Sequence, residues 1–398
     1  MTGRVFVTGI GIICAIGKNV SETLASLQDS RPGISHISIL ETVHRGELPV
    51  GEIKLTNPEL AARAGVTNLD MQTRTSLLGL IAASEALDNA GIDPKDKNYR
   101  TGVISASTVG GMDRTEIDYR NYHLGAPYNH FVLTHDCGYS TEMIATSLGF
   151  HDMVSTISTA CSSSANSIMF GARLIRHGLL DRVVAGGTDA LSKFTLNGFN
   201  TLMILDKQPC RPFDKSRVGL NLGEGAAFLV LESEEALAGR TPLCELSGYA
   251  NANDAYHQTA SSPDGYGPYL SMRQAMDVSG LNPGMIDYIN AHGTGTDNND
   301  LTEGIAIERI FGDKVPLVSS TKPFTGHTLG AAGAVEAVIS ILSIRSSNIF
   351  PNLNFREKMD ELHFEPVREI RRNTPLRNVL SNSFGFGGND STLIFSAI

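Results

Sequence analysis

The sequence Ser-Thr-Ala-Cys-Ser-Ser-Ser-Ala-Asn at residues 158–166 joins a predicted strand to a predicted helix. Residues 153–157 are rich in β-branched side chains, which favours a short strand. From Ala165 onward, apolar residues recur at helical spacing as far as Leu179. We therefore expect Cys161 to be the first residue of a helix, where unpaired N–H groups and the helix dipole would lower the pKa of its thiol. The alternative is a small buried hydrophobe, the usual role of a free cysteine.

Composition excludes several classes of protein. A chain of 398 residues is longer than one hydrophobic core usually serves, so two domains or two fused halves are expected. The net charge of −10 argues against nonspecific nucleic-acid binding. Five cysteines without framework spacing favour a reducing compartment. No apolar run reaches the ~18 residues that span a bilayer, and no secretory segment precedes the first strand. We expect a cytoplasmic protein without membrane insertion.

The chain alternates strands and helices and repeats this pattern from about residue 243. Strands are predicted at 4–11, 101–107, 153–157, 182–187, 225–232, 243–250, 285–291, 315–320, 379–383 and 392–396, and helices at 18–31, 69–91, 165–179, 267–280, 301–311 and 331–344. Such alternation predicts α/β architecture with a mostly parallel sheet in each half, covered by helices. The halves are 1–242, which carries Cys161, and 243–398, in which His327 holds the equivalent place. Residues 112–140 have little periodicity and are expected to leave the sheet as an interface or a lid.

Three further turns carry polar residues after predicted strands, at 290–296, 319–327 and 382–388. Taken singly, a histidine at a turn is more often structural than catalytic, and glycine clusters usually only permit positive φ. Taken together, a thiol at a helix start and two histidines, His292 and His327, at glycine-flanked strand ends suit acyl transfer.

The order of these motifs carries a family resemblance. Cys161 is followed by His-Gly-Thr-x-Thr at 292–296 and by Lys-x-x-x-Gly-His at 322–327, and the similarity extends to the Gly-Phe-Gly-Gly segment at 385–388. The chain resembles the elongating β-ketoacyl-[acyl-carrier-protein] synthases, the type I/II condensing enzymes with a thiolase-like fold, and is nearest to type II. Thiolases instead use a second cysteine near the carboxyl end, and none follows Cys244 here. The resemblance implies two pseudo-symmetric βαβαβ halves with mixed, mostly parallel sheets, layered α-β-α-β-α.

The resemblance also implies an activity. An acyl group would be held as a thioester on Cys161, and malonyl-carrier protein would lose CO2 and attack it, so that the chain grows by two carbons in fatty acid biosynthesis. His292 and His327 would donate hydrogen bonds to the malonyl thioester oxygen. Lys322 would order the histidines and be held by Asp300 and Glu303.

Further roles follow from the same resemblance. Thr294 and Thr296 would hold the phosphopantetheine arm of the carrier, and Phe386 would gate the passage between thiol and acyl pocket while its N–H joins that of Cys161 in an oxyanion hole. The remaining matches are Val109 and Phe199 as walls of the acyl pocket and Glu336 as a buried acid that in relatives can sit near a structural cation. No cofactor of its own and no catalytic metal are expected. The expected partners are acyl- and malonyl-loaded acyl carrier protein and a second copy of the chain in a homodimer.

Several positions depart from the family pattern. The usual Gly-Gly-Thr-Asn after the gate reads Gly-Gly-Asn-Asp at 387–390, and Asp297 replaces the usual proline. A docking arginine expected near Met203 is missing, and an acid, Asp70, stands where a lysine is expected. Two alternatives therefore stay open: a ketosynthase of a specialised polyene or polyketide lipid pathway, and a non-catalytic partner subunit resembling a chain-length factor. The intact Cys161, His292 and His327 argue against the second.

Overall fold

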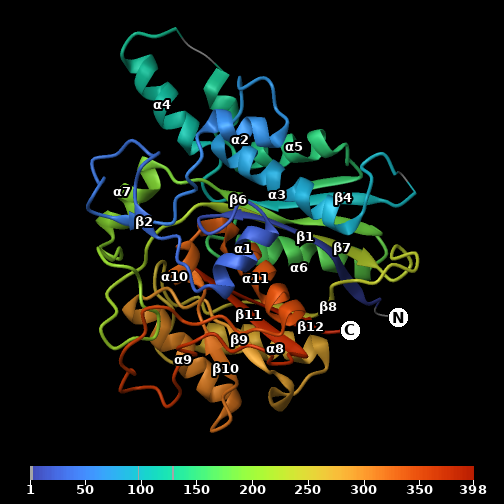
Figure 1. Ribbon diagram of the computed structural model, residues 1–398, viewed down its shortest axis with the longest axis vertical. Coiled ribbons are helices and arrows are strands. Elements are labelled where there is room, and N and C mark those ends of the chain that lie inside the picture. Colours follow the sequence, from blue (N-terminus) through green and yellow to red (C-terminus); the bar gives the residue numbers. More distant parts are fainter. Residues whose placement is uncertain (1–2, 97, 128–129) are drawn as a thin grey trace.

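The computed structural model describes residues 3–96, 98–127 and 130–398. In this part of the chain, ten strands form one sheet in the order β10-β9-β11-β12-β8-β1-β7-β6-β4-β5, beside a small pair, β2 and β3 (Figure 1). The strands are β1 (Val5–Cys14), β2 (Ser35–His36), β3 (Pro49–Val50), β4 (Thr101–Ala106), β5 (Met153–Ile157), β6 (Arg182–Asp189), β7 (Gly225–Ser233), β8 (Cys244–Asn253), β9 (Tyr288–Asn290), β10 (Leu317–Ser319), β11 (Asn378–Gly385) and β12 (Asn389–Ser396).

The two halves of the sheet repeat one arrangement of strands. In the first half β1 pairs antiparallel with β7 and β7 with β6, whereas β6 pairs parallel with β4 and β4 with β5. In the second half β8, β12, β11, β9 and β10 follow the same order and directions. A short antiparallel contact between β1 and β8 joins them. The expected α/β fold with two similar halves is confirmed, and the sheet is mixed. In each half four of the five strands run in the same direction and only β7 or β12 runs against them, as expected of a mixed, mostly parallel sheet.

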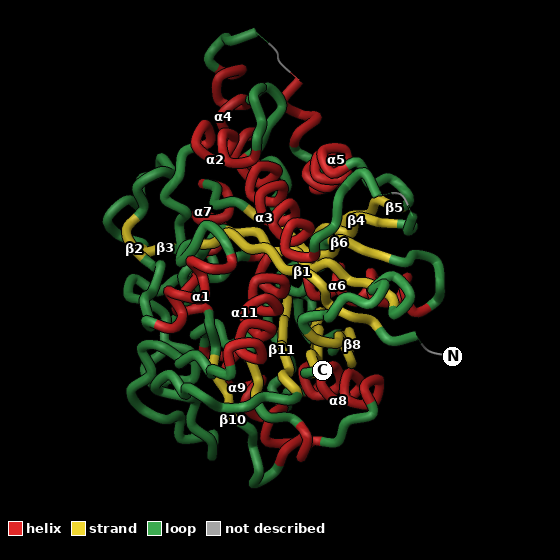
Figure 2. The backbone as a smooth tube through the Cα atoms, turned by 45° about the vertical axis from the view of Figure 1, so that its right-hand side comes forward, coloured by secondary structure: helices red, strands yellow, loops and turns green. Residues whose placement is uncertain are grey.

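Helices cover both outer faces and fill the space between the halves (Figures 1 and 2). Helix α3 packs on β1, β7 and β6, and α8 packs on β8 and β12. Helices α6 and α11 form the middle layer and contact strands of both halves as well as one another. The helices are α1 (Val20–Gln28), α2 (Asn57–Ala64), α3 (Arg74–Ala90), α4 (Met112–His123), α5 (Cys137–Leu148), α6 (Ser163–Arg176), α7 (Lys193–Thr201), α8 (Tyr266–Ser279), α9 (Asp297–Phe311), α10 (Lys322–Thr325) and α11 (Ala332–Ser346).

Helix α11 is buried on all sides. Every residue from Ala332 to Ile344 is buried, and apart from Glu336 these residues are apolar or small all round rather than amphipathic. The missing side chain of Gly333 allows α6 to approach, since a Cβ there would lie 2.7 Å from the backbone N of Ala165. The stretch Leu329–Ser346 is long and apolar enough to cross a membrane, but 89% of it is buried inside the protein, the position of a core helix.

Several helices were not among the predicted elements, including α2, α4, α5 and α7. Helix α2 was not predicted; a capping box of Thr56 and Glu59 begins it, and only Leu60 and Ala61 are buried, which leaves too few apolar positions for a periodic signal. Residues 112–140 contain α4, which projects from the rest of the molecule at the top of Figure 1. Its exposed side chains include Ile117 and Tyr119, and residues 128–129 of this segment lie outside the described part.

Candidate active site

The candidate nucleophile lies in a strained turn between β5 and α6. Ala160 has φ +53°, a left-handed conformation that is uncommon for a residue with a side chain. Helix α6 begins at Ser163 with Ser162 as its cap, so Cys161 precedes the helix and is not its first residue as expected. The end of β11 passes close above this turn, since a Cβ on Gly385 would lie 3.1 Å from the backbone N of Cys161.

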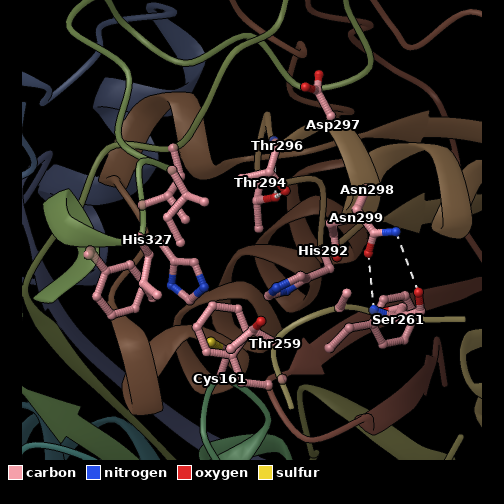
Figure 3. A pocket seen from close by; sticks show the side chains of 18 of the residues that line it. Cys161, Thr259, Ser261, His292, Thr294, Thr296, Asp297, Asn298, Asn299 and His327 are labelled. Carbon is pink, nitrogen blue, oxygen red and sulfur yellow. Dashed lines mark hydrogen bonds between the residues drawn. The ribbon is translucent and has the colours of Figure 1, made fainter. Parts of the chain in front are cut away.

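The structure brings together the three residues proposed for acyl transfer. The sulfur of Cys161 and a ring nitrogen from each of His292 and His327 all lie within 4.8 Å of one another. All three residues are buried, and both rings point into the space beside the thiol (Figure 3). His292 follows β9 in the second half, and His327 follows the short helix α10. Strand ends from both halves therefore converge on one site.

Both imidazoles are neutral and carry their single N–H hydrogen on Nε2. Lys322 Nζ donates to Nδ1 of His292 at 3.1 Å, and the N–H of Leu329 donates to Nδ1 of His327 at 3.1 Å. Burial, together with the positive charge of Lys322, lowers the pKa of both histidines well below the usual value. A neutral ring whose Nδ1 accepts a hydrogen bond carries its hydrogen on Nε2. The site thus offers two N–H donors without a positive charge on either ring.

Lys322 is held by a different acid from the one expected. Its ammonium pairs with Glu336 and also donates to the carbonyl oxygen of His292 at 2.5 Å. Both carboxylates expected to hold it bind backbone instead. Glu303 accepts the N–H groups of His292 and Gly293 at 2.9 and 2.8 Å, and Asp300 accepts that of Thr294 at 2.9 Å. Asp300 and Glu303 therefore fix the turn that carries His292.

The thiol of Cys161 is not acidified in this conformation. Burial raises its pKa to about 12, although the charge of Lys322 and the N–H of Phe386 both oppose this rise. The expected lowering is wrong because the site excludes water: only 8% of Cys161 is exposed. The resting residue is a protonated thiol.

A cavity of about 320 Å³ opens onto the thiol. Its lining includes both histidines, Thr294 and Thr296, whose hydroxyls lie 2.8 Å apart, and the rings of Phe199 and Phe386. These two rings stack with centroids 6.0 Å apart and planes 14° from parallel.

Val109 is not brought into this cavity. It lines a second cavity of about 300 Å³ with Met112 and Phe194. Val109 and Phe199 nevertheless pack in the same apolar cluster, so apolar side chains connect the two cavities.

The three residues at the site could also hold a metal ion, since a thiol and two imidazoles are common ligands of soft divalent metals. The ammonium of Lys322 beside His292 opposes an added positive charge. Glu336 keeps one carboxylate oxygen, Oε2, buried and without a partner among the described residues, and burial raises its pKa to about 7. A free buried oxygen suits an oxygen-ligated cation, so that expectation for Glu336 stays a prediction.

Sequence reasoning missed several residues of the site. Asp189, at the end of β6, accepts hydrogen bonds from Ser107 and from the N–H of Gly330, and so ties β4 and β6 to the turn after His327. The sequence feature that could have indicated Asp189 is an acidic residue at the end of a mostly apolar strand. Ser261 and Asn298 line the cavity mouth and bond to each other through the Ser261 N–H, at 3.0 Å (Figure 3). No motif singled them out.

Comparisons with known proteins agree with this geometry. Residues 2–236 match the model of the beta-ketoacyl synthase N-terminal domain, and residues 243–356 match that of the C-terminal domain. The chain is 34% identical over 406 residues to a 3-oxoacyl-[acyl-carrier-protein] synthase 2 of Staphylococcus aureus (strain N315), which covers 98% of both chains. It is 33% identical over 407 residues to nodulation protein E of Rhizobium meliloti (strain 1021), which covers all of both. A solved structure described as the ishigamide ketosynthase/chain length factor superimposes with a TM-score of 0.93 at 32% identity over the full length of both chains. This likeness confirms the expected thiolase-like fold.

Proposed function

The chain belongs to the β-ketoacyl synthase family, and from that premise we propose that it joins malonyl units to acyl chains carried on acyl carrier protein, with Cys161 as nucleophile. The observation that carries this proposal is the pair of neutral imidazoles beside the thiol, each with its Nδ1 already occupied by a donor. Two N–H donors aimed at one point suit a reaction in which negative charge develops on a thioester oxygen.

The first half-reaction is acyl transfer to Cys161. The sulfur attacks the acyl thioester carbon, the bond to the carrier's thiol breaks, and the thiol proton leaves with that group. The N–H of Phe386 lowers the pKa of the Cys161 thiol, and with the N–H of Cys161 it stabilises the developing oxyanion. The acyl-enzyme divides the reaction into two steps, which gives ping-pong kinetics.

The second half-reaction is decarboxylative condensation. The malonyl thioester oxygen accepts hydrogen bonds from Nε2–H of His292 and His327, the bond to the carboxylate carbon breaks, and CO2 leaves. The enolate carbon then attacks the acyl carbonyl, and Cys161 is released as its thiolate. Burial and the charge of Lys322 keep both rings neutral, and Lys322 orients His292 through its hydrogen bond.

The cavity supports roles for the remaining residues. Thr294 and Thr296 present hydroxyls for the phosphopantetheine arm along the way to the thiol. Phe386 and Phe199 stack between the thiol's cavity and the apolar cluster of Val109, so their separation would admit an acyl chain toward Val109. The substrates arrive on a carrier protein, and the enzyme needs no cofactor of its own.

The assembly is a homodimer of chains whose halves are 1–242 and 243–398. The exposed apolar side chains on and beside α4, among them Ile117, Tyr119 and Leu124, support a dimer contact there. The proposed compartment is the cytoplasm, which five free cysteines support.

A second candidate is a ketosynthase of a specialised polyene or polyketide pathway. It is favoured by the likeness to the ishigamide ketosynthase/chain length factor structure and by the changes at 387–390 and at Asp297. The chemistry would be the same, with another primer and with a second, different subunit in place of the second copy.

One experiment tests both candidates. The purified chain is incubated with a mixed pool of acyl-carrier proteins and malonyl-carrier protein, and the adducts and products are identified by mass spectrometry. The proposal expects an acyl adduct on Cys161 and a product two carbons longer, and the Cys244→Ala variant, which removes a cysteine that lines neither cavity, should behave like the parent. An adduct without product until a partner subunit is added would favour the second candidate. An adduct that survives Cys161→Ala would contradict both.

A further inference from the structure

Asp390, at the start of β12, is a buried acid that the proposed reaction does not use. Its side chain is completely buried, and neither carboxylate oxygen has a hydrogen-bond partner among the described residues. An ionised carboxylate in such a place is costly, because burial removes its water and nothing replaces it. A proton on one oxygen removes the charge.

A second acid lies beside it. A Cβ added to Gly267, in the first turn of α8, would lie 2.0 Å from Asp390 Oδ2 and 2.9 Å from Cβ of Asp254, so both acids flank this glycine. The charged groups that face Asp390 are Asp254, from the end of β8, and Glu303, from α9, and both are acidic. On the neighbouring strands its register partners are Phe384 and Ala252, which carry no charge. Burial, followed by these two acids, raises the pKa of Asp390 to about 8.

Asp254 connects this acid to the loop that carries Phe386. A Cβ on Gly388 would lie 2.3 Å from Asp254 Oδ1, so the loop rests directly on that carboxylate, and Gly388 has φ +72°. The adjacent Gly387 accepts a hydrogen bond from Asn253 at 2.7 Å and donates one to the carbonyl of Gln258 at 2.8 Å. A displacement of Asp254 would therefore also displace the loop at residues 386–388.

We infer that Asp390 is a positioning residue for the Phe386 loop, which it keeps closed as a neutral carboxylic acid beside Asp254. When Asp390 ionises, the two carboxylates repel, Asp254 withdraws from Gly388, and the loop opens over Cys161. The family pattern at this place ends in an amide, Gly-Gly-Thr-Asn, which has the same shape and cannot ionise. The inference rests on the gating role of Phe386 under the proposed function.

The test compares the parent with Asp390→Asn and with Asp264→Asn, a control that removes an exposed acid from the neighbouring segment. The first measurement is the melting temperature from pH 5 to 9. A carboxyl whose folded pKa is raised from about 4 to about 8 stabilises the fold below pH 4, and this contribution is lost as the pH rises through 8. From pH 5 to 9, the melting temperature of the parent should therefore fall by at least about 2 °C more than that of Asp390→Asn. The difference in melting temperature between the parent and Asp264→Asn should stay constant.

The second measurement is the rate at which iodoacetamide alkylates Cys161, expressed as the ratio of parent to Asp390→Asn. The titration of Cys161 is common to both proteins and cancels in the ratio. We expect this ratio to be near one at pH 6.5 and to rise at least about threefold by pH 9. Loop opening typically takes microseconds to milliseconds, so it precedes each alkylation.

A melting difference that does not change with pH would overturn the ionisation of Asp390, and a constant alkylation ratio would overturn its link to the loop. The melting temperatures are also measured in potassium chloride and in choline chloride. If potassium chloride stabilises the parent more than it stabilises Asp390→Asn at every pH, Asp390 binds a cation instead of a proton, and the inference is overturned. If Asp390→Asn does not fold, Asp254→Asn takes its place. Because it removes a neighbouring negative charge, the melting temperature of this variant should begin to fall at a lower pH than that of the parent. Neither measurement requires turnover, so a failure of the proposed function would not be mistaken for a failure of this inference.

Discussion

The imidazole rings of His292 and His327 lie edge to face, with centroids 5.3 Å apart and planes at 84°. One ring is held through Nδ1 by a lysine ammonium and the other by a backbone N–H, so their Nε2 atoms are left as donors. Under the proposed function this arrangement would separate the two half-reactions, because acyl transfer to the thiol would use backbone N–H groups and only condensation would use both rings.

His292→Ala should abolish condensation and leave acylation largely intact. Loss of one oxyanion-type donor typically lowers the rate by ~10²–10³. Single-turnover assays with acyl-carrier protein alone, and then with malonyl-carrier protein added, separate the two steps. Condensation close to the parent rate would remove His292 from this role, and His327→Ala is the matched variant on the other ring.

Alkylation of Cys161 should be slow at neutral pH and should rise continuously up to pH 10. The reactive species is the thiolate, and a pKa raised to about 12 leaves little of it near pH 7. Mass spectrometry of peptides after timed iodoacetamide pulses measures this, with the partly exposed Cys137 as an internal reference. A rate that levels off below pH 8 would mean that the thiol is acidified after all.

Glu336→Gln should destabilise the protein by about 3–5 kcal/mol, since it leaves the buried ammonium of Lys322 without its counter-charge. The double variant Lys322→Met/Glu336→Gln removes both charges and should recover much of this loss without recovering condensation. Chemical denaturation and the condensation assay give the two readouts. If the double variant is no more stable than Glu336→Gln, the pair is not the main source of the effect.

Phe386→Ala and Phe199→Ala should have similar effects, because each removes one ring of the same stack. Both should speed alkylation of Cys161 and relax the preference among acyl chain lengths. The fold should survive, since Phe386 is only partly buried, whereas a fully buried phenylalanine typically costs about 3–5 kcal/mol when truncated. Unfolding of Phe386→Ala, with unchanged chain-length preference in any soluble fraction, would make this residue part of the core instead.

The sequence predicted those parts of the site that depend on motifs at strand ends. Cys161, His292 and His327 lie in the segments that follow β5, β9 and β10. Because the carboxyl ends of parallel strands lie at one edge of a sheet, such positions come close together. The partner of Lys322 could not be found in this way. Glu336 lies one helix further along and reaches the lysine through the interior, whereas Asp300 and Glu303, which the family resemblance implied, bind the backbone of the turn that carries His292.

Other features of the structure could not be predicted from the sequence, for physical reasons. Position in a turn indicated a helix dipole at Cys161 but gave no measure of how completely the surrounding chain excludes water, which decides its pKa. The directions of β7 and β12 depend on connections that periodicity does not reveal. Val109 lines the second cavity and not the one that opens onto the thiol, so its place in the wall of the acyl pocket stays a prediction.

The all-round burial of α11 bears on how the protein is made. This helix covers the inner face of β7 as well as β11, yet it is synthesised about a hundred residues after β7 leaves the ribosome. Until Ala332–Ser346 emerges, the nascent first half has the core around α3 but presents an uncovered apolar surface on the inner face of β7. Fragments that end before α11 should therefore aggregate or remain bound to chaperones, and folding of both halves should be completed together, late in translation.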